Sequence, residues 1–433
     1  MIEDLRHALE HAPLQKTRGK VVHAVGTLIE AELPGATVGS MCAVGGDKLS
    51  EVIGFRGRRA LLMPLGSTEG VVYGTEVRFL EESITVAVGD ALIGRVVDGL
   101  GHPIDEKPPL GIRRRRPVTN APPPPMQRSL IHEPLWTGIR ALDGMIPLGK
   151  GQRVCFIAGA GVGKSTLLGM VARHVRADIN VICLIGERGR EVREFIEYNL
   201  GPEGMARSIV VVVTSDASPP LKVKGAFLAT TIAEHFRDEG RDVLLMMDSL
   251  TRFALAQRQI GLSAGEPPGA RGFPPSTFEL LPRLLERVGT GSSDRGGSIT
   301  GIYTVLVDGD DVVGDPVADA VRGIVDGHVI LSRKLASHGH FPAIQVLGSL
   351  SRVADAIVPQ RHIEAAAAVR RLMAIWEDSE ELIRLGAYKR GTNADVDRAI
   401  AAMPEIRKFL QQTTTEPTDP SHTLAWMEQI AKG

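Results

Sequence analysis

This chain of 433 residues has few cysteines, almost no net charge and no long apolar runs. The three cysteines, Cys42, Cys155 and Cys183, form no C-x-x-C pair, and two of them lie inside apolar strand-like runs, which favours reduced, buried thiols in a cytoplasmic protein. No apolar run approaches the ~18 residues that a membrane-spanning helix needs. The formal net charge of −1 offers no general attraction for nucleic acid or acidic lipid. We therefore expect a soluble globular protein with, at this length, two or three domains.

The chain is also poor in residues for base stacking and for metal binding. Aromatic residues make up 4% of the chain, and the β-rich N-terminal region has only Phe55, Tyr73 and Phe79. A surface for stacking nucleic-acid bases is therefore poorly supplied. His338 and His340 have a spacing that metal ligands can use, but no further cluster of cysteine or histidine joins them in the sequence. We interpret them as loop histidines.

The first residues carry acidic side chains and lack the apolar core of a secretory signal. Residues 1–17 are instead typical of a short helix, with Ile2, Leu5 and Leu9 on one face.

Residues 18–93 contain short β-rich runs separated by glycine, a pattern typical of a small barrel or sandwich. The expected strands include Val21–Leu28, Glu51–Phe55, Ala60–Pro64 and Thr75–Phe79. A linker-like stretch, residues 107–128, follows with seven prolines and the run Arg113–Arg116. Four consecutive arginines suggest nucleic-acid binding, but we favour solvated charges on a linker.

Residues 94–352, which include this linker, alternate between strand-like and helix-like patterns over most of their length. The alternation predicts an α/β domain with a mostly parallel sheet covered on both faces. The expected strands are Ile179–Ile185, Ser208–Thr214, Val243–Asp248, Gly301–Val307 and Gly327–Leu331, with a helix over Lys222–Glu239. Residues 353–433 form a helical domain in this interpretation, because Ile363–Leu385 and Ala394–Gln412 are rich in alanine and charge at helical spacing.

A glycine-rich turn lies between an apolar strand, which begins at Val154, and a helix-like segment. It follows the phosphate-loop consensus Gly-x-x-x-x-Gly-Lys-Ser/Thr, except that Ala158 occupies the first position. Converging backbone N–H groups would hold phosphate, Lys164 would reach the β/γ-phosphates, and the Ser165 hydroxyl would bind Mg²⁺. A chance turn with an exposed lysine is the alternative, which the strand–loop–helix context disfavours. The predicted nucleotide-contacting residues are Ala158, Gly159, Ala160, Gly161, Val162, Gly163, Lys164, Ser165 and Thr166.

Two further motifs supply acidic residues and an arginine. The apolar strand Val243–Asp248 ends in one carboxylate, about 85 residues after the loop, as a Walker B strand that binds the metal does. A third strand ends in Gly-Glu-Arg-Gly-Arg-Glu, where Glu187 could polarise the attacking water and Arg188 could hold the γ-phosphate. A polar loop of alternating charges would explain this last segment equally well.

Four motifs together resemble the ATPases of flagellar and virulence type III protein export, which are similar to the catalytic subunit of rotary F-type ATP synthases. The resemblance runs from about residue 18 to 412. It implies an N-terminal β-barrel, a RecA-like P-loop core, a C-terminal helical domain and a homohexameric ring with nucleotide between subunits. The motifs are Ala-Gly-Ala-Gly-Val-Gly-Lys-Ser, Gly-Glu-Arg-Gly-Arg-Glu-Val, Met-Asp-Ser-Leu-Thr-Arg-Phe-Ala and Gly-His-Val-Ile-Leu-Ser-Arg.

The resemblance also implies a role for individual residues. Glu187 matches the family's catalytic glutamate, whereas the non-catalytic subunit of rotary ATPases has glutamine there. Arg188 matches a γ-phosphate arginine, and Glu191 a carboxylate that reaches the metal through water. Asp248 is the Walker B position, and Arg252 is a further phosphate-side arginine.

Two more residues carry over from the family pattern. Phe341, in Gly-His-Phe-Pro-Ala-Ile, matches an aromatic presented to the adenine ring, although a core phenylalanine is the alternative. Arg352, in Ser-Leu-Ser-Arg-Val, matches the arginine finger supplied to the neighbouring subunit, and would otherwise be an ordinary surface arginine.

Within the family, the segment that begins at Thr214 and the Gly-Val-Gly that begins at Gly161 favour the flagellar branch, while Lys-Ser-Thr-Leu-Leu suits virulence relatives equally well. A hexameric RNA translocase and a proton-driven ATP synthase subunit are further alternatives, and the scarcity of aromatic residues argues against the first.

The resemblance implies ATP and Mg²⁺ as ligands and a set of protein partners. These are a stator-like export regulator bound by the N-terminal helix, a stalk-like central subunit, chaperone–substrate complexes and an export gate, with no nucleic acid. The expected location is cytoplasmic, peripheral to the cytoplasmic face of the inner membrane.

Overall fold

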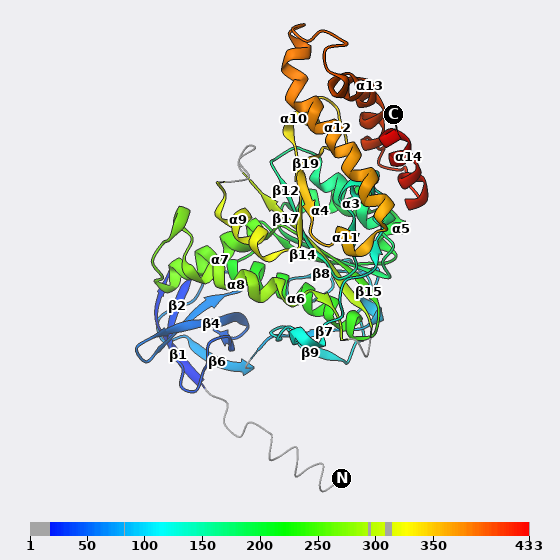
Figure 1. Cartoon of the computed structure of the whole chain (residues 1–433). Coiled ribbons are helices and arrows are strands. Elements are labelled where there is room, and N and C mark those ends of the chain that lie inside the picture. Colours follow the sequence, from blue (N-terminus) through cyan, green and yellow to red (C-terminus); the bar gives the residue numbers. More distant parts are fainter. Residues whose placement is uncertain (1–17, 82, 293–295, 308–313, 433) are drawn as a thin grey trace.

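The computed structural model describes residues 18–81, 83–292, 296–307 and 314–432. The predicted N-terminal helix over residues 1–17 lies outside this part of the chain. Figure 1 shows a small β-barrel at one end, a central sheet between helices, and a helical domain at the other end. The predicted fold class is therefore confirmed.

Six strands close the N-terminal barrel in the order β1-β2-β5-β4-β3-β6. Its interior contains Val21, Ile29, Leu62 and Val77, all fully or almost fully buried. A single strand over Val21–Leu28 is a wrong prediction, because the chain turns back at Gly26, whose positive φ of 55° suits glycine. The strands are β1 (Arg18–Val25), β2 (Leu28–Glu32), β3 (Met41–Val44), β4 (Lys48–Arg56), β5 (Arg59–Pro64) and β6 (Glu76–Glu81).

The central domain is built on a sheet with the order β19-β18-β12-β17-β15-β13-β14-β8, to which β16 adds beside β17. All pairs along this path are parallel except that of β18 with β19, so the predicted, mostly parallel sheet is confirmed. The strands are β8 (Val96–Asp98), β12 (Arg153–Ala158), β13 (Ile179–Glu187), β14 (Ser208–Thr214), β15 (Asp242–Asp248), β16 (Gly289–Thr290), β17 (Ser298–Leu306), β18 (Gly327–Leu331) and β19 (Ile344–Ser351).

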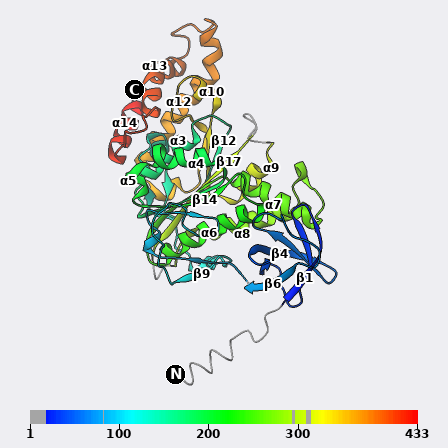
Figure 2. The same ribbon diagram turned by 180° about the vertical axis from the view of Figure 1, so that it is seen from behind.

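Successive residues of the buried strands belong to different cores on the two faces of this sheet. Val181 packs in the core with α6 to α9, whereas Ile182 packs in the core with α2, α3 and the C-terminal helices. Both faces are therefore covered, as expected (Figures 1 and 2). The helices are α2 (Arg140–Met145), α3 (Lys164–His174), α4 (Gly189–Glu194), α5 (Gly201–Met205), α6 (Pro219–Asp238), α7 (Leu250–Ala264), α8 (Pro275–Leu285), α9 (Pro316–Ile324) and α10 (Arg333–Ser337).

The C-terminal region is helical, as predicted. Helix α12 packs against both α13 and α14, and Val369, Ile406 and Met427 join the core on one face of the sheet. The helices are α11 (Ala354–Ile357), α12 (Gln360–Arg384), α13 (Ala394–Leu410) and α14 (Pro420–Lys432).

The arginine run between barrel and sheet is attached to the central domain. Arg116 pairs with Asp238 at 2.6 Å, and Arg114 pairs with Glu239 at 3.0 Å, both at the end of α6. Arg115 donates to the Thr85 hydroxyl at 2.8 Å. The run therefore does more than carry solvated charge, because it fastens the connecting segment to α6. Two small two-stranded sheets lie in this part of the sequence. They pair β7 (Thr85–Ala87) with β9 (Arg115–Pro117), and β10 (Pro134–Leu135) with β11 (Leu148–Gly149). Within the described ranges, no helix has the length and apolarity to cross a bilayer.

Candidate functional site

The predicted phosphate loop, the glutamate motif and the Walker B carboxylate all follow the carboxyl ends of parallel strands. The loop follows β12 at Ala158, Glu187 ends β13, and Asp248 ends β15. These strands lie close together in the sheet, with only β17 between β12 and β15. Ligands of open α/β sheets bind at this edge. The topology therefore brings together three motifs that are spread over 91 positions of the sequence, from Ala158 to Asp248.

The phosphate loop turns tightly into α3. Gly161 and Gly163 have positive φ values of 77° and 86°, which side-chain-bearing residues rarely adopt, and Gly163 is the N-cap of α3. Val162 is buried beneath the loop, whereas Ala160, Gly161, Ser165 and Thr166 are exposed at its surface. The first-turn N–H groups of the 11-residue α3 can therefore face an anion.

Lys164 forms an ion pair with Asp248 across the site, and both side chains are mostly buried. The Thr304 hydroxyl of β17 donates to the same Asp248 oxygen, Oδ1, at 2.7 Å. Sequence reasoning missed Thr304, because nothing in the local pattern of a buried strand distinguishes it. Its place on the strand next to β15 becomes evident only from the sheet order.

Glu187 lies beside this pair, and its environment is unusual for a carboxyl group. Burial, and then the charge of Asp248, raise the pKa of Glu187 to about 7, while Lys164 opposes the shift. A hydrogen bond with Glu191 also raises the pKa of Glu187, and the same bond lowers that of Glu191. A carboxylate with a pKa near neutrality can both accept and release a proton at physiological pH.

Two arginines lie beside Glu187. Arg188 is largely exposed and contacts Glu191 at 3.1 Å. Arg252, in the first turn of α7, lies against the Gly186 backbone, because a Cβ added at Gly186 would meet the Arg252 Cγ at 3.0 Å. The structure therefore places Arg188, Glu191 and Arg252 around the glutamate that the sequence singled out.

Phe341 lies against the phosphate loop, because a Cβ added at Gly163 would be 3.4 Å from its ring. The ring is 45% exposed, so it is not a core phenylalanine. It lines a cavity of about 420 Å³ together with Gln412 and Thr413, and the Gln412 N–H donates to the Phe341 carbonyl at 3.0 Å. This cavity, called the base-side cavity below, is linked to the phosphate loop through Phe341, and its size suits a small-molecule site.

Arg352 is the predicted site residue that does not lie near the phosphate loop. Strand β19 runs antiparallel to β18, so that Ile344 lies opposite Leu331 at the carboxyl edge and Ser351 opposite Gly327 at the amino edge. Arg352 follows Ser351, at the edge away from Lys164. It is exposed and donates to the Arg322 carbonyl at 3.4 Å. Within one chain, Arg352 cannot contact the nucleotide site.

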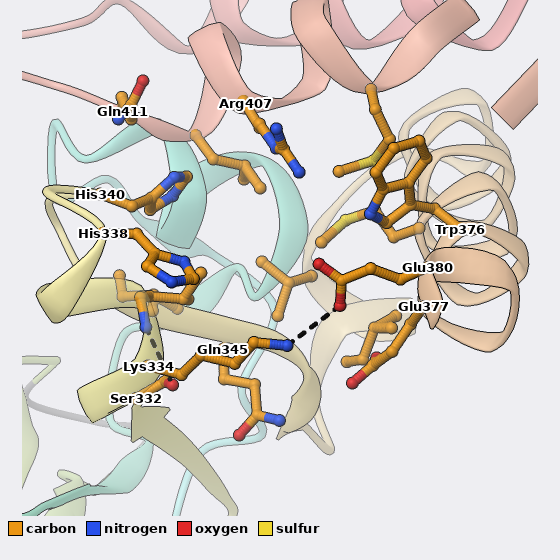
Figure 3. Close-up of a pocket in the computed structure, with 17 residues that line it drawn as sticks. Ser332, Lys334, His338, His340, Gln345, Trp376, Glu377, Glu380, Arg407 and Gln411 are labelled. Carbon is orange, nitrogen blue, oxygen red and sulfur yellow. Dashed lines mark hydrogen bonds and ion pairs between the residues drawn. The ribbon is translucent and has the colours of Figure 1, made fainter. Parts of the chain in front are cut away.

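The oxygen groups at the loop suit a hard divalent cation. Ser165 supplies an exposed hydroxyl and Asp248 a carboxylate, the ligand types that Mg²⁺ uses together with substrate phosphates. Over the described part of the chain, no three His, Cys, Asp or Glu side chains gather as a metal cluster. His338 and His340 instead line a separate cavity of about 520 Å³ (Figure 3).

Three segments of the chain match known protein families. Residues 138–351 match the nucleotide-binding domain of the ATP synthase alpha/beta family, and residues 21–81 match the beta-barrel domain of that family. Residues 358–429 match the T3SS EscN ATPase C-terminal domain.

Similar proteins cover almost the whole chain. A flagellum-specific ATP synthase of Bacillus subtilis is 48% identical over 99% of this chain and 98% of its own length. A type 3 secretion system ATPase of Xanthomonas euvesicatoria is 51% identical over 95% and 93%. The structure of the assembled ATPase EscN from the enteropathogenic E. coli type III secretion system has a TM-score of 0.91 and 43% identity, covering 95% of this chain and 100% of that one. The chain therefore belongs to the ATP synthase alpha/beta family, in the group that contains flagellum-specific ATP synthases and type 3 secretion ATPases.

Proposed function

We propose that this chain is the Mg²⁺-dependent ATPase of a flagellar type III export apparatus, which couples ATP hydrolysis to chaperone release, unfolding and export of flagellar proteins. The observation that carries the ATPase assignment is Glu187, whose pKa is raised to about 7 beside the Lys164–Asp248 pair. A site that only bound nucleotide would not need a proton acceptor at this position.

Binding of the triphosphate starts with the exchange of partners at the Lys164–Asp248 pair. The Lys164 ammonium turns from Asp248 to the β/γ-phosphates, and the first turn of α3 donates backbone N–H groups. Ser165 and Asp248 would hold Mg²⁺, with Glu191 reaching it through water, and the ion would supply positive charge to the phosphates. The Thr304 hydroxyl keeps the Asp248 carboxylate in place after Lys164 has left.

Hydrolysis then requires a proton acceptor and cations for the transition state. Glu187 accepts the proton of the attacking water. The Lys164 ammonium, whose charge opposes the rise in the pKa of Glu187, moves toward the phosphates at this stage. Arg188 and Arg252 lie close enough to Glu187 to turn toward the γ-phosphate. The Phe341 ring receives the adenine in the base-side cavity.

A ring of six identical subunits completes the site. The position of Arg352 at the opposite edge of the sheet supports a role at a neighbour's nucleotide, through a head-to-tail interface. One solved relative, 42% identical with a TM-score of 0.87 over 95% of this chain and 100% of its own, is described as the assembled EscN in complex with its central stalk EscO. We extend both features, assembly and a stalk-like partner, to this chain.

The remaining partners and the location belong to the same proposal. They are a stator-like export regulator that binds residues 1–17, chaperone–substrate complexes and an export gate, at the cytoplasmic face of the inner membrane. Deletion of residues 1–17 should weaken regulator binding in a pull-down and leave nucleotide binding intact. A large fall in melting temperature on deletion would show instead that the segment belongs to the core.

The flagellar assignment is tested by complementation. Relatives from both branches are similar to this chain to nearly the same degree, 48% for a flagellar and 51% for a type 3 secretion protein. Expression in a motile bacterium that lacks its flagellar export ATPase should restore swimming, and the Lys164→Ala variant should not. Restoration of virulence secretion in the corresponding strain, without restoration of swimming, would assign the chain to virulence export instead.

A further inference from the structure

Residues 214–222, called the clamp loop below, join the end of β14 to the first turn of α6 and lie directly beside Glu187. Glu187 ends β13 opposite Thr214, and the pairing register shifts there, where Gly186 has a positive φ of 71°. The Ser215 N–H donates to the Glu187 carbonyl at 2.9 Å. The backbone that carries Glu187 is therefore held by the clamp loop as well as by its own strand.

Lys222 closes the clamp loop from the side of α6. Its ammonium donates to the Ser215 carbonyl at 2.8 Å, and it has no ion-pair partner among the described residues. Ser215 is thus bonded through both backbone groups, by its N–H to Glu187 and by its carbonyl to Lys222. A charged donor forms a stronger hydrogen bond than a neutral one, so Lys222 is well suited to fix this residue.

The position of Lys222 is unfavourable for the stability of α6. The residue lies in the first turn, where the helix dipole disfavours a cation, and that turn contains no acidic residue. Burial, and then the charge of Arg252, lower the pKa of Lys222, whereas Asp216 opposes the shift. Two cations therefore lie near each other beside Glu187. A cation placed against such local preferences is typical of a functional site.

Ser218, in the middle of the clamp loop, is fastened to the N-terminal barrel. It is the N-cap of α6, but its hydroxyl does not cap the helix and instead donates to the Leu65 carbonyl, just after β5, at 2.9 Å. An N-cap serine usually accepts from the N–H groups of the first turn, so the contact with the barrel replaces a stabilising one. Lys224 adds an ion pair with Glu51 of β4 at 2.6 Å. The barrel therefore fixes the segment that holds Glu187.

We propose that the clamp loop positions the proton acceptor Glu187, with Lys222 and Ser218 as its positioning residues. This inference rests on the proposed ATPase function. Lys222 holds the Ser215 carbonyl, and Ser218 holds the loop against the barrel. Neither residue contacts the substrate. Both fix the direction from which the Glu187 carboxylate reaches the attacking water, and a misplacement of about 1 Å in such a geometry can lower turnover about 10²-fold.

The test compares kcat of the full-length protein, measured as phosphate release, with the dissociation constant of ADP. Lys222→Met keeps the length of the side chain but removes the donor, and should lower kcat about tenfold while ADP binding stays unchanged. Lys222→Arg keeps a charged donor and should retain most of the turnover.

The matched control is Lys107→Met. Lys107 also donates to a backbone carbonyl at 2.8 Å, that of Gly94, whose N–H bonds Ser208 at the opposite end of β14. Its loss should leave kcat and ADP binding unchanged. Ser218→Ala is a second variant of the clamp loop and should lower kcat severalfold without a change in ADP binding. Ser218→Ala decides if melting temperatures show that Lys222→Met is unfolded.

A double substitution shows whether Lys222 acts through Glu187. Added to Glu187→Gln, Lys222→Met should lower turnover no further, because the group that it positions is already missing. The proposal is overturned by an unchanged kcat in the deciding variant, by equal losses in Lys222→Met and Lys222→Arg, or by a full additional loss in the double variant. A parallel loss of ADP affinity would make Lys222 a phosphate-binding residue instead. Full turnover by Glu187→Gln alone would contradict the proposed function itself, whatever the Lys222 variants show.

Discussion

The carboxyl and amino edges of the central sheet carry different side chains. At the carboxyl edge, Lys164 and Asp248 form a mostly buried ion pair, Thr304 donates to Asp248, and the charges of the pair act on the half-buried Glu187. At the amino edge, Arg352 is exposed, and its guanidinium donates to the Arg322 carbonyl. The carboxyl edge carries the phosphate loop, the glutamate and the acidic end of β15, and the amino edge carries an arginine that lies away from all three. The comparison teaches that the proposed mechanism needs contacts between subunits, because the arginine we assign to it lies away from the site of its own chain.

The largest effect is expected from Lys164→Ala at the carboxyl edge. The change removes the charge that must reach the β/γ-phosphates and leaves Asp248 without its ion-pair partner. Mg·ATP hydrolysis, measured as phosphate release, should be abolished. Lys48→Ala in the barrel is the control for loss of one lysine and should retain activity. Full turnover by the Lys164 variant would refute the phosphate-loop assignment.

The next effect comes from the other edge. Arg352→Ala should bind ATP but lose about 10³-fold in turnover, as arginine fingers do elsewhere. Arg361→Ala, an exposed arginine at the start of α12, should remain active. Phosphate release and nucleotide binding are measured on the same preparations.

Mixing experiments sharpen this prediction. Combined with inactive Glu187→Gln chains, Arg352→Ala chains should recover partial activity, because some interfaces join an intact Glu187 to an intact Arg352. Two variants that co-assemble yet stay inactive would argue against action between subunits.

Glu187→Gln should separate binding from chemistry. The substitution keeps the size of the side chain but removes the proton acceptor, so turnover should fall by roughly 10²-fold or more while nucleotide binding is retained. Parallel loss of binding and turnover would make Glu187 a structural residue.

The pH dependence of the unmodified protein tests the same residue. The raised pKa of Glu187 moves its protonation into the neutral range, to about 7. Because only the charged form accepts a proton, kcat/KM should fall as the pH is lowered through about 7. A profile that stays flat down to the ordinary pKa range of a glutamate would contradict the assignment.

The smallest effect is expected at Thr304. Thr304→Val removes the hydrogen bond to Asp248 but keeps the shape of the buried side chain, and should reduce kcat/KM about tenfold. Thr304→Ser keeps the hydroxyl and should remain close to the unmodified protein. Equal loss in both variants would indicate a packing effect instead of an orienting one.

Most of the carboxyl edge was predictable from the sequence, because each of its motifs is local. The loop from Ala158 to Lys164 and the strand that ends at Asp248 are contiguous stretches whose chemistry follows from residue type and spacing. The motif identifies Glu187, but its raised pKa is beyond sequence reasoning, since it arises from burial and from a carboxylate far along the chain. The sequence predicts one strand over Val21–Leu28 where the structure has two, because one glycine turn within a β-rich run is a weak local signal.

By itself the sequence determined the fold class, the phosphate loop and the nature of the reactive groups, because strand periodicity, glycine positions and motif spacing are local properties of a chain. The tertiary structure decided which of those groups meet. Sheet order brings Thr304 to Asp248, the antiparallel turn of β19 carries Arg352 away from Lys164, and one loop presents His340 and Phe341 to two different cavities. Such contacts depend on strands and helices far apart in sequence, and their energies come from burial and charge that exist only once the chain is packed.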